Sequence, residues 1–120
     1  MTQVHKMAPR ASAHVAAEVD GVSKDRIVVT GGFFPSGTVL GQLDSGEFTQ
    51  LNIADGATEA HIAKAVIYGH VDASTEAQPT LCHARVCALY ADKLTWPEAI
   101  TAEQKAAAVA ELAKAQIVLR

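Results

Sequence analysis

The chain has 120 residues, of which 49% are hydrophobic, 5% aromatic and 19% charged, and its formal net charge is −3. This length fits one compact domain and excludes a multidomain enzyme. The sequence has no basic cluster of the kind that neutralises phosphates, and no apolar run near the roughly 18 residues of a membrane span. We therefore expect neither a nucleic-acid partner nor a membrane partner. The N-terminus also lacks the continuous apolar segment of a signal peptide, which predicts synthesis in the cytoplasm.

Alanine supplies much of the apolar content. There are 23 alanines, against three Phe, two Tyr and one Trp. An alanine side chain buries little area, so each one contributes less than the ~1.5 to 3 kcal/mol of a buried Leu, Ile or Phe. The composition therefore predicts a monomer of marginal stability that gains stability by association.

The N-terminal part of the chain, residues 1–25, mixes Ala, Ser, His and charged residues without a period of 2 or 3.6, and it carries Pro9. Such a pattern predicts a flexible arm. The remaining residues, 26–120, are then expected to form a single β-rich domain.

Short apolar segments separated by turn residues follow the arm. Asp44-Ser45-Gly46 is the clearest turn signal, because these residue types favour hairpin turns. Several short strands between turns predict a small, mainly β, barrel-like domain. The predicted strands are 26–30, 33–43, 47–51, 63–71 and 80–90.

The two cysteines, Cys82 and Cys87, both fall in the strand predicted at 80–90. Five residues apart on one strand, they would point to opposite faces and lie roughly 16 Å apart, at about 3.3 Å per residue. Since Cα atoms more than ~7 Å apart cannot be bridged, no disulfide is expected between them.

The C-terminal third predicts one helix and a closing strand. Pro97 keeps the residue before it extended, and Thr101 with Gln104 matches a capping box. The helix is expected at about 102–115, and the strand at 117–120. The predicted apolar face of the helix consists of Ala102, Ala106, Val109, Leu112 and Ala113.

Catalytic and metal-binding patterns are not found. No two of the five histidines have the spacing of a preformed metal site, and there is no nucleophile motif or phosphate-binding loop. We therefore expect no catalytic residue, no metal and no cofactor. A small ligand- or metal-binding module that gathers His61, His70 and His83 in one pocket is the alternative.

Residues 94–105 (LTWPEAITAEQK), with the Ala-rich helix and the apolar strand after them, resemble the end of the lambda-type bacteriophage head decoration proteins. In that family a Trp-Pro followed by an acidic or small residue precedes a Thr- or Ser-capped helix, a pattern matched here by Trp96, Pro97 and Glu98. The resemblance covers about residues 26–120. Other segments in the family's order are 37–41 (GTVLG), the hairpin at 44–47 and the strand at 65–68.

This resemblance implies a non-enzymatic structural protein with a β-clip fold and a small helical part. Members of the family form homotrimers that seat at three-fold positions on the expanded head of a tailed phage and cement it against DNA pressure. The expected partners are thus further copies of the chain and the major capsid protein, and the expected location is the capsid exterior of the virion of a phage or prophage.

The resemblance also makes residues 1–25 the capsid-binding arm. An arm of this kind gains backbone hydrogen bonds by adding a strand to a neighbour, which offsets the entropy lost on ordering. Its candidate partner-binding residues are Val4, His5, Val15 and Val19.

Overall fold

The computed structural model describes residues 11–120. The mainly β fold with one C-terminal helix, predicted from the sequence, is confirmed. Within these residues no helix has the length and apolar character needed to cross a membrane. The strands are β1 (Val15–Glu18), β2 (Lys24–Val29), β3 (Phe33–Phe34), β4 (Val39–Gln42), β5 (Phe48–Gln50), β6 (Ala63–Tyr68), β7 (Val71–Asp72), β8 (Gln78–His83), β9 (Cys87–Leu89) and β10 (Ile117–Leu119). The helices are the 3-10 helix η1 (Ala91–Lys93) and α1 (Ala102–Lys114).

Five strands close into a barrel in the order β2-β5-β4-β6-β8. Its longest ladder joins β2 to β8, with Lys24 opposite His83 at one end and Val29 opposite Gln78 at the other. Closure leaves these strands without a free edge, which removes the usual template for aggregation. Inside lies a compact cluster of Val29, Phe34, Leu40, Ile67 and Ala73.

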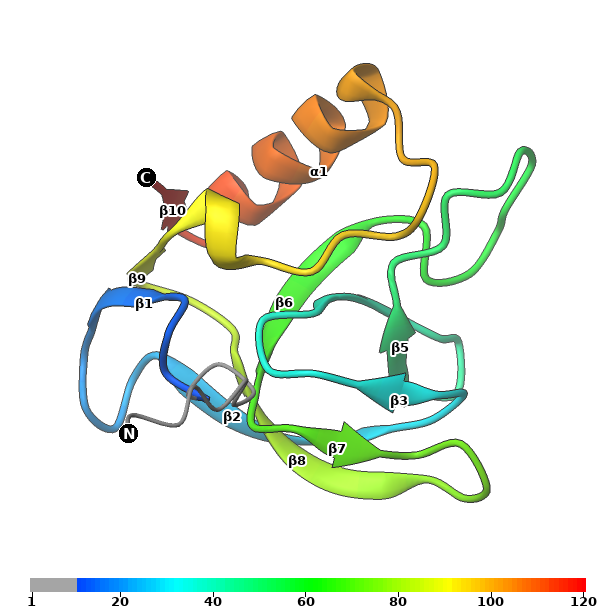
Figure 1. The fold of residues 1–120 in the computed structure, drawn as a ribbon, viewed down its shortest axis with the longest axis horizontal. Coiled ribbons are helices and arrows are strands. Elements are labelled where there is room, and N and C mark those ends of the chain that lie inside the picture. The colour runs from blue at the N-terminus through cyan, green and yellow to red at the C-terminus, as the bar shows by residue number, and fades with distance from the viewer. Residues whose placement is uncertain (1–10) are drawn as a thin grey trace, which may run out of the picture.

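A second sheet of three strands, in the order β1-β9-β10, lies beside the barrel, and α1 packs between β6 and β10 (Figure 1). A second apolar cluster fills the space enclosed by this sheet, α1 and the barrel wall. Its fully buried members include Leu89, Leu112 and Ile117. The C-terminal strand and helix are therefore part of the hydrophobic core.

The capping box predicted at the start of α1 is confirmed. Thr101 Oγ1 accepts a hydrogen bond from the Gln104 amide at 3.1 Å, and Gln104 Oε1 accepts one from the Thr101 amide at 2.9 Å. The predicted apolar face of the helix is only partly right. Ala102, Ala106 and Ala113 are exposed, whereas Ala108, which the pattern missed, is buried beside Leu112.

We expect Thr101→Ala to lower the free energy of unfolding by about 1 kcal/mol, because it leaves an N-terminal amide of α1 without its side-chain acceptor. Urea denaturation would measure the change. Thr75→Ala serves as the control, since Thr75 is exposed in a loop and should alter stability by less than ~0.5 kcal/mol. Equal effects of the two substitutions would contradict a capping role.

The strand predicted at 80–90 is wrong as a single element. β8 ends at His83 in the barrel, and β9 begins at Cys87 in the second sheet. Between them the Ala84 and Arg85 amides both donate to the Ser23 carbonyl, and Val86 adopts a φ of 47°. The chain thus turns around Ser23 and changes sheets. Two other predicted strands are also interrupted. The segment 33–43 contains β3 and β4, and the segment 63–71 contains β6 and β7.

The two cysteines are not on one strand, as the sequence predicted, but they form no disulfide. Cys82 and Cys87 lie in different sheets, and both are buried free thiols. Burial raises the pKa of each thiol to about 11, so neither is present as a reactive thiolate near neutral pH.

The domain begins earlier than residue 26. Residues 15–18 form β1, paired with β9, and β2 begins at Lys24, so the prediction of a flexible arm reaching to residue 25 is corrected for the part from 11 onward. β1 forms because it pairs with β9, a strand about 70 residues away, and local composition does not reveal such a pairing. Residues 1–10, with Val4 and His5, lie outside the described residues.

Candidate interaction surface

The outward-facing side of the β1-β9-β10 sheet is apolar. Ala17 is aligned with Ala88, and Ala88 with Val118, so one small apolar row crosses all three strands. Val118 is 50% exposed and Val19, just past β1, is 47% exposed. A sheet with one side in water normally carries polar residues on that side. We call this row, with Val19 and Val86, the outer sheet face; it borders a shallow depression of about 350 Å³.

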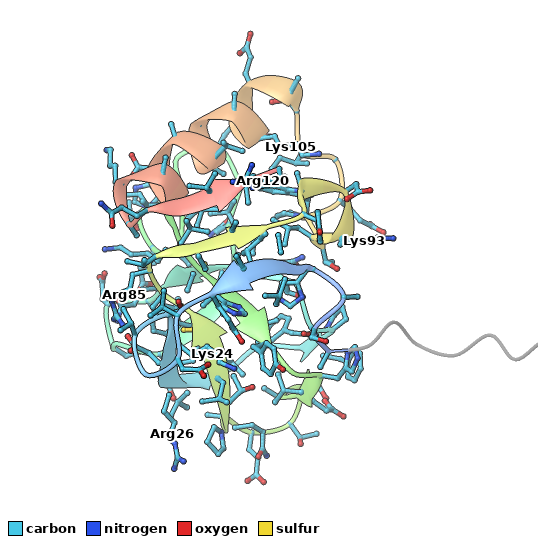
Figure 2. The ribbon with its side chains drawn as sticks, turned by 90° about the vertical axis from the view of Figure 1, so that its left-hand side faces the viewer. Lys24, Arg26, Arg85, Lys93, Lys105 and Arg120 are labelled. Atoms are coloured by element: carbon cyan, nitrogen blue, oxygen red, sulfur yellow. The ribbon has the colours of Figure 1, made fainter. Side chains whose placement is uncertain are left out.

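Basic side chains surround the outer sheet face. Figure 2 views the molecule from this side, with β1, β9 and β10 in front. Several of the cations are already engaged: Arg85 forms a two-pronged ion pair with Asp25, and Lys24 lies 3.4 Å from Glu18. The labelled set is Lys24, Arg26, Arg85, Lys93, Lys105 and Arg120. The side is therefore an apolar centre with a polar rim, which is the usual anatomy of a protein–protein interface.

A cluster of polar side chains lies behind β1, where that strand meets the barrel. His83 Nε2 lies 2.6 Å from Glu18 Oε2, and the Lys24 ammonium is 4.2 Å from the centroid of the Tyr68 ring. The His14 ring stands edge-on to the His83 ring, with 5.5 Å between centroids. The hydrogen bond from His83 is the main reason that the pKa of Glu18 is lowered. Four separate elements and the loop before β1 are joined at this point.

The histidines of the alternative hypothesis are not brought together. His83 belongs to the buried cluster, His70 accepts a hydrogen bond from the Ser36 amide at a turn, and His61 lies in the loop before β6. Among residues 11–120 no three His, Cys, Asp or Glu side chains are placed to hold a metal ion. The pairing that does exist, His14 with His83, was missed by sequence reasoning because only the β1–β9 pairing creates it.

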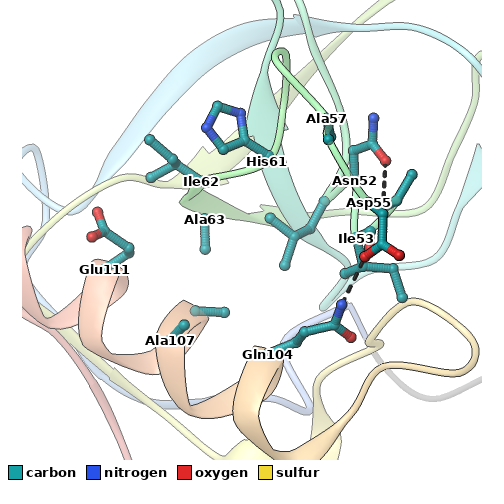
Figure 3. Close-up of a pocket in the computed structure, with 14 residues that line it drawn as sticks. Asn52, Ile53, Asp55, Ala57, His61, Ile62, Ala63, Gln104, Ala107 and Glu111 are labelled. Carbon is teal, nitrogen blue, oxygen red and sulfur yellow. Dashed lines mark hydrogen bonds between the residues drawn. The ribbon is translucent and has the colours of Figure 1, made fainter.

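A cavity of about 410 Å³ lies between α1 and the loop before β6. Figure 3 shows Gln104, Ala107 and Glu111 of α1 on one side, with His61 and Ile62 across from them. Its hydrogen bonds hold the loop: Gln104 Nε2 donates to the Ile53 carbonyl at 3.2 Å, and the Ala54 amide donates to Asn52 Oδ1 at 3.0 Å. The polar side chains of Gln104 and Asn52 therefore hold the backbone of this loop in place.

The residues of the Trp-Pro motif play different structural roles. Trp96 is half-buried against the core cluster under α1, and the Lys105 ammonium lies 5.1 Å from its ring centroid. Pro97 is buried, whereas Glu98 is exposed. The segment is extended as predicted, because the Val39 amide donates to the Thr95 carbonyl and Thr95 forms a parallel bridge with Thr38. The motif therefore ties the entry to α1 onto β4.

Two of the candidate partner-binding residues can be placed. Val15 is half-buried and packs against the core cluster, so its side chain points inward. Val19 is exposed at the margin of the outer sheet face. Of this pair only Val19 offers a surface to a partner in the structure as it stands.

The fold and this surface define a small β-barrel protein whose exposed features suit association. The family model of the bacteriophage lambda head decoration protein D matches residues 4–117, and the chain belongs to that family. No curated protein matches the chain. Membership gives the chain a structural role in a phage capsid.

Proposed function

We propose that this chain is a non-enzymatic cement protein which forms homotrimers and binds the exterior of an expanded phage head at three-fold positions. It is made in the host cytoplasm and binds the major capsid protein of a tailed phage. The observation that carries the proposal is the family match over residues 4–117. Bound trimers would link neighbouring capsid subunits and resist the pressure of packaged DNA.

The outer sheet face supports self-association. Ala17, Val19 and Val118 of this face are exposed, and covering their apolar area with a second copy would recover about 25 cal/mol per Å² buried. A trimer also presents three binding sites at once, which raises its avidity for a lattice.

Light scattering of the purified protein tests the trimer. We expect a mass three times the 12.6 kDa of the chain. Val118→Asp, which puts a charge in the outer sheet face, should lower that mass, whereas Val28→Asp, at a similarly exposed valine of the barrel wall, should not. A wild-type monomer at all concentrations would refute the trimer. A loss of mass in the Val28 variant alone would place the contact elsewhere.

Co-sedimentation with capsid shells tests the binding. We expect the protein to bind expanded shells and to leave unexpanded shells bare. Removal of residues 1–10, which contain Val4 and His5, is expected to weaken binding at least tenfold, because these residues are part of the proposed capsid-binding arm. A wild-type protein that ignores expanded shells would refute the proposal. If the truncated protein bound normally, residues 1–10 would have no part in capsid binding.

A further inference from the structure

The N-terminal strand β1 is weakly attached by its backbone. Among residues 11–120 it is an edge strand of its sheet and pairs with β9 alone, through Val15, Ala17 and Glu18, with an irregularity between the first two. It connects to β2 through a turn in which Gly21 has a φ of 76°. The turn is fixed at its far end by Ser23, whose hydroxyl accepts from the Val19 amide and donates to the Val86 carbonyl. β1 can therefore separate from β9 while the barrel stays closed.

Side chains hold β1 in place as well as the backbone, whose bonds include one from the Tyr90 amide to the His14 carbonyl at 2.7 Å. Glu18 bonds to His83 of β8 at 2.6 Å and lies 3.4 Å from Lys24 of β2. His14, immediately before β1, packs its ring against His83 and lies 6.3 Å from the Tyr68 ring of β6. One cluster that contains two histidines thus adds to what holds β1 in place, beside its pairing with β9 and the packing of Val15 against the core.

Both histidines are buried with an unpaired ring nitrogen. His14 is 1% exposed and His83 is 0% exposed, and among residues 11–120 neither His14 Nε2 nor His83 Nδ1 has a hydrogen-bond partner. A neutral imidazole tolerates an unpaired nitrogen far better than a charged one, because a buried charge needs a partner. For His83, Glu18 would be that partner; for His14 none of the ion pairs provides one.

The electrostatic surroundings of His14 disfavour its protonation. Burial, with a further contribution from His83, lowers the pKa of His14 to about 4, although Glu18 opposes the shift. Burial also lowers the pKa of His83. On its other side His14 borders a cavity lined by one acid and one base, Asp92 and Lys93, and by His70. Because Asp92 and Lys93 carry opposite charges, together they do not favour a protonated His14.

We propose that His14, His83 and Glu18 form a pH-sensitive latch, which holds β1 on the barrel near neutral pH and releases it in mildly acidic solution. Protonation of His14 would place a charge next to His83, at a ring nitrogen that has no acceptor among residues 11–120. The charged side chain gains solvation by leaving, and because it directly precedes β1, it takes the start of that strand with it. The inference concerns this chain alone and stands or falls independently of capsid binding.

The direction of the pH dependence follows from the two states. In the released state His14 is solvated and titrates near 6.5, whereas in the closed state its pKa is about 4. The closed state is therefore fully favoured above about pH 6.5, and it loses this advantage as the pH falls toward 4. Within that window the equilibrium constant for release should rise about tenfold per pH unit.

Hydrogen exchange measured residue by residue from pH 7.5 to 4.5 tests the latch. The protection factors of the β1 amides should fall about a hundredfold between pH 6.5 and 4.5. Those of Leu40, Val66 and Ile67 in the barrel should stay unchanged. Constant protection of β1 over the whole range would overturn the proposal. So would loss of β1 protection only together with that of the barrel, because this would be global unfolding.

Two variants assign the effect to His14. His14→Phe keeps a ring in the site but cannot be protonated, so its β1 protection should vary less than threefold over the same pH range. His61→Phe, which removes an exposed histidine of a loop, should behave like the wild type. A normal pH response in the His14 variant would overturn the proposal. Should that variant not fold, NMR titration of wild-type His14 decides: a midpoint at or above 6.5 excludes the latch.

Discussion

Gly41→Ala is expected to lower the free energy of unfolding by at least about 3 kcal/mol, or to prevent folding. An alanine Cβ at this position would lie 2.2 Å from the carbonyl oxygen of Ala60. That oxygen cannot retreat easily, because it accepts a hydrogen bond from the Asn52 amide at 2.8 Å, and the Ala60 amide donates to Gln42 at 3.1 Å. The close approach also coincides with the irregular register between β4 and β6.

Gly32→Ala is the matched control for this prediction. A Cβ there would lie 3.3 Å from the side chain of Phe34, which can shift, and Gly32 does not have a positive φ. We expect a loss below about 1 kcal/mol. Guanidinium denaturation of the two variants and the wild type would measure both values. A Gly41 variant as stable as the Gly32 variant would mean that β4 and the 51–60 loop can move apart.

Leu112→Ala is expected to cost about 3 kcal/mol of unfolding free energy. The Leu112 side chain is 0% exposed and lies in the core cluster that α1 shares with the barrel wall and β10. Removing it leaves a cavity that the backbone of a helix held at both ends, by Thr101 at its start and by β10 after it, cannot fill. Thermal and chemical denaturation would report the loss.

The control for this second prediction is Leu81→Ala. Leu81 is 38% exposed on the barrel wall, so the same chemical change removes fewer contacts and should cost less than about 1.5 kcal/mol. If the two leucines gave equal losses, α1 would contribute little to the core.

The sequence predicted elements whose signals are local. The capping box at Thr101 and Gln104 depends on residues three apart, and the turn at Asp44 on three successive residues, so both are visible in the printed chain. The extended Trp96-Pro97 segment follows from proline geometry alone. The family resemblance on Trp96, Pro97 and Glu98 is confirmed by the match over residues 4–117.

Features that depend on distant pairing could not be predicted in this way. The apolar alternation of 80–90 continues through the point where the chain leaves the barrel, so nothing local marks the break before Val86. β1 has a short, alanine-containing sequence that becomes a strand only because β9 accepts it. The many alanines of α1 make several of its faces equally apolar. Tertiary packing determines that the face with Ala108 is the buried one.

The candidate interaction surface has the same origin. Ala17, Ala88 and Val118 are far apart in the sequence and individually unremarkable, and their alignment in one row requires the register of three strands. His14 and His83 meet for the same reason. A single sequence indicates which residues are apolar or titratable; the pairing of β1 with β9 determines which of them become neighbours.

The order β1-β9-β10 has a practical consequence for the ends of the domain. Val15 and Leu119 are both aligned with Leu89, one on each side of it. With about 4.8 Å between adjacent strands, the first and last strands lie roughly 10 Å apart at this level. A guest peptide fused after Arg120 would therefore begin near β1. A linker of a few residues from Arg120 to the start of β1, in place of the residues before β1, would also yield a circularly permuted domain, with new termini in a loop such as 54–57.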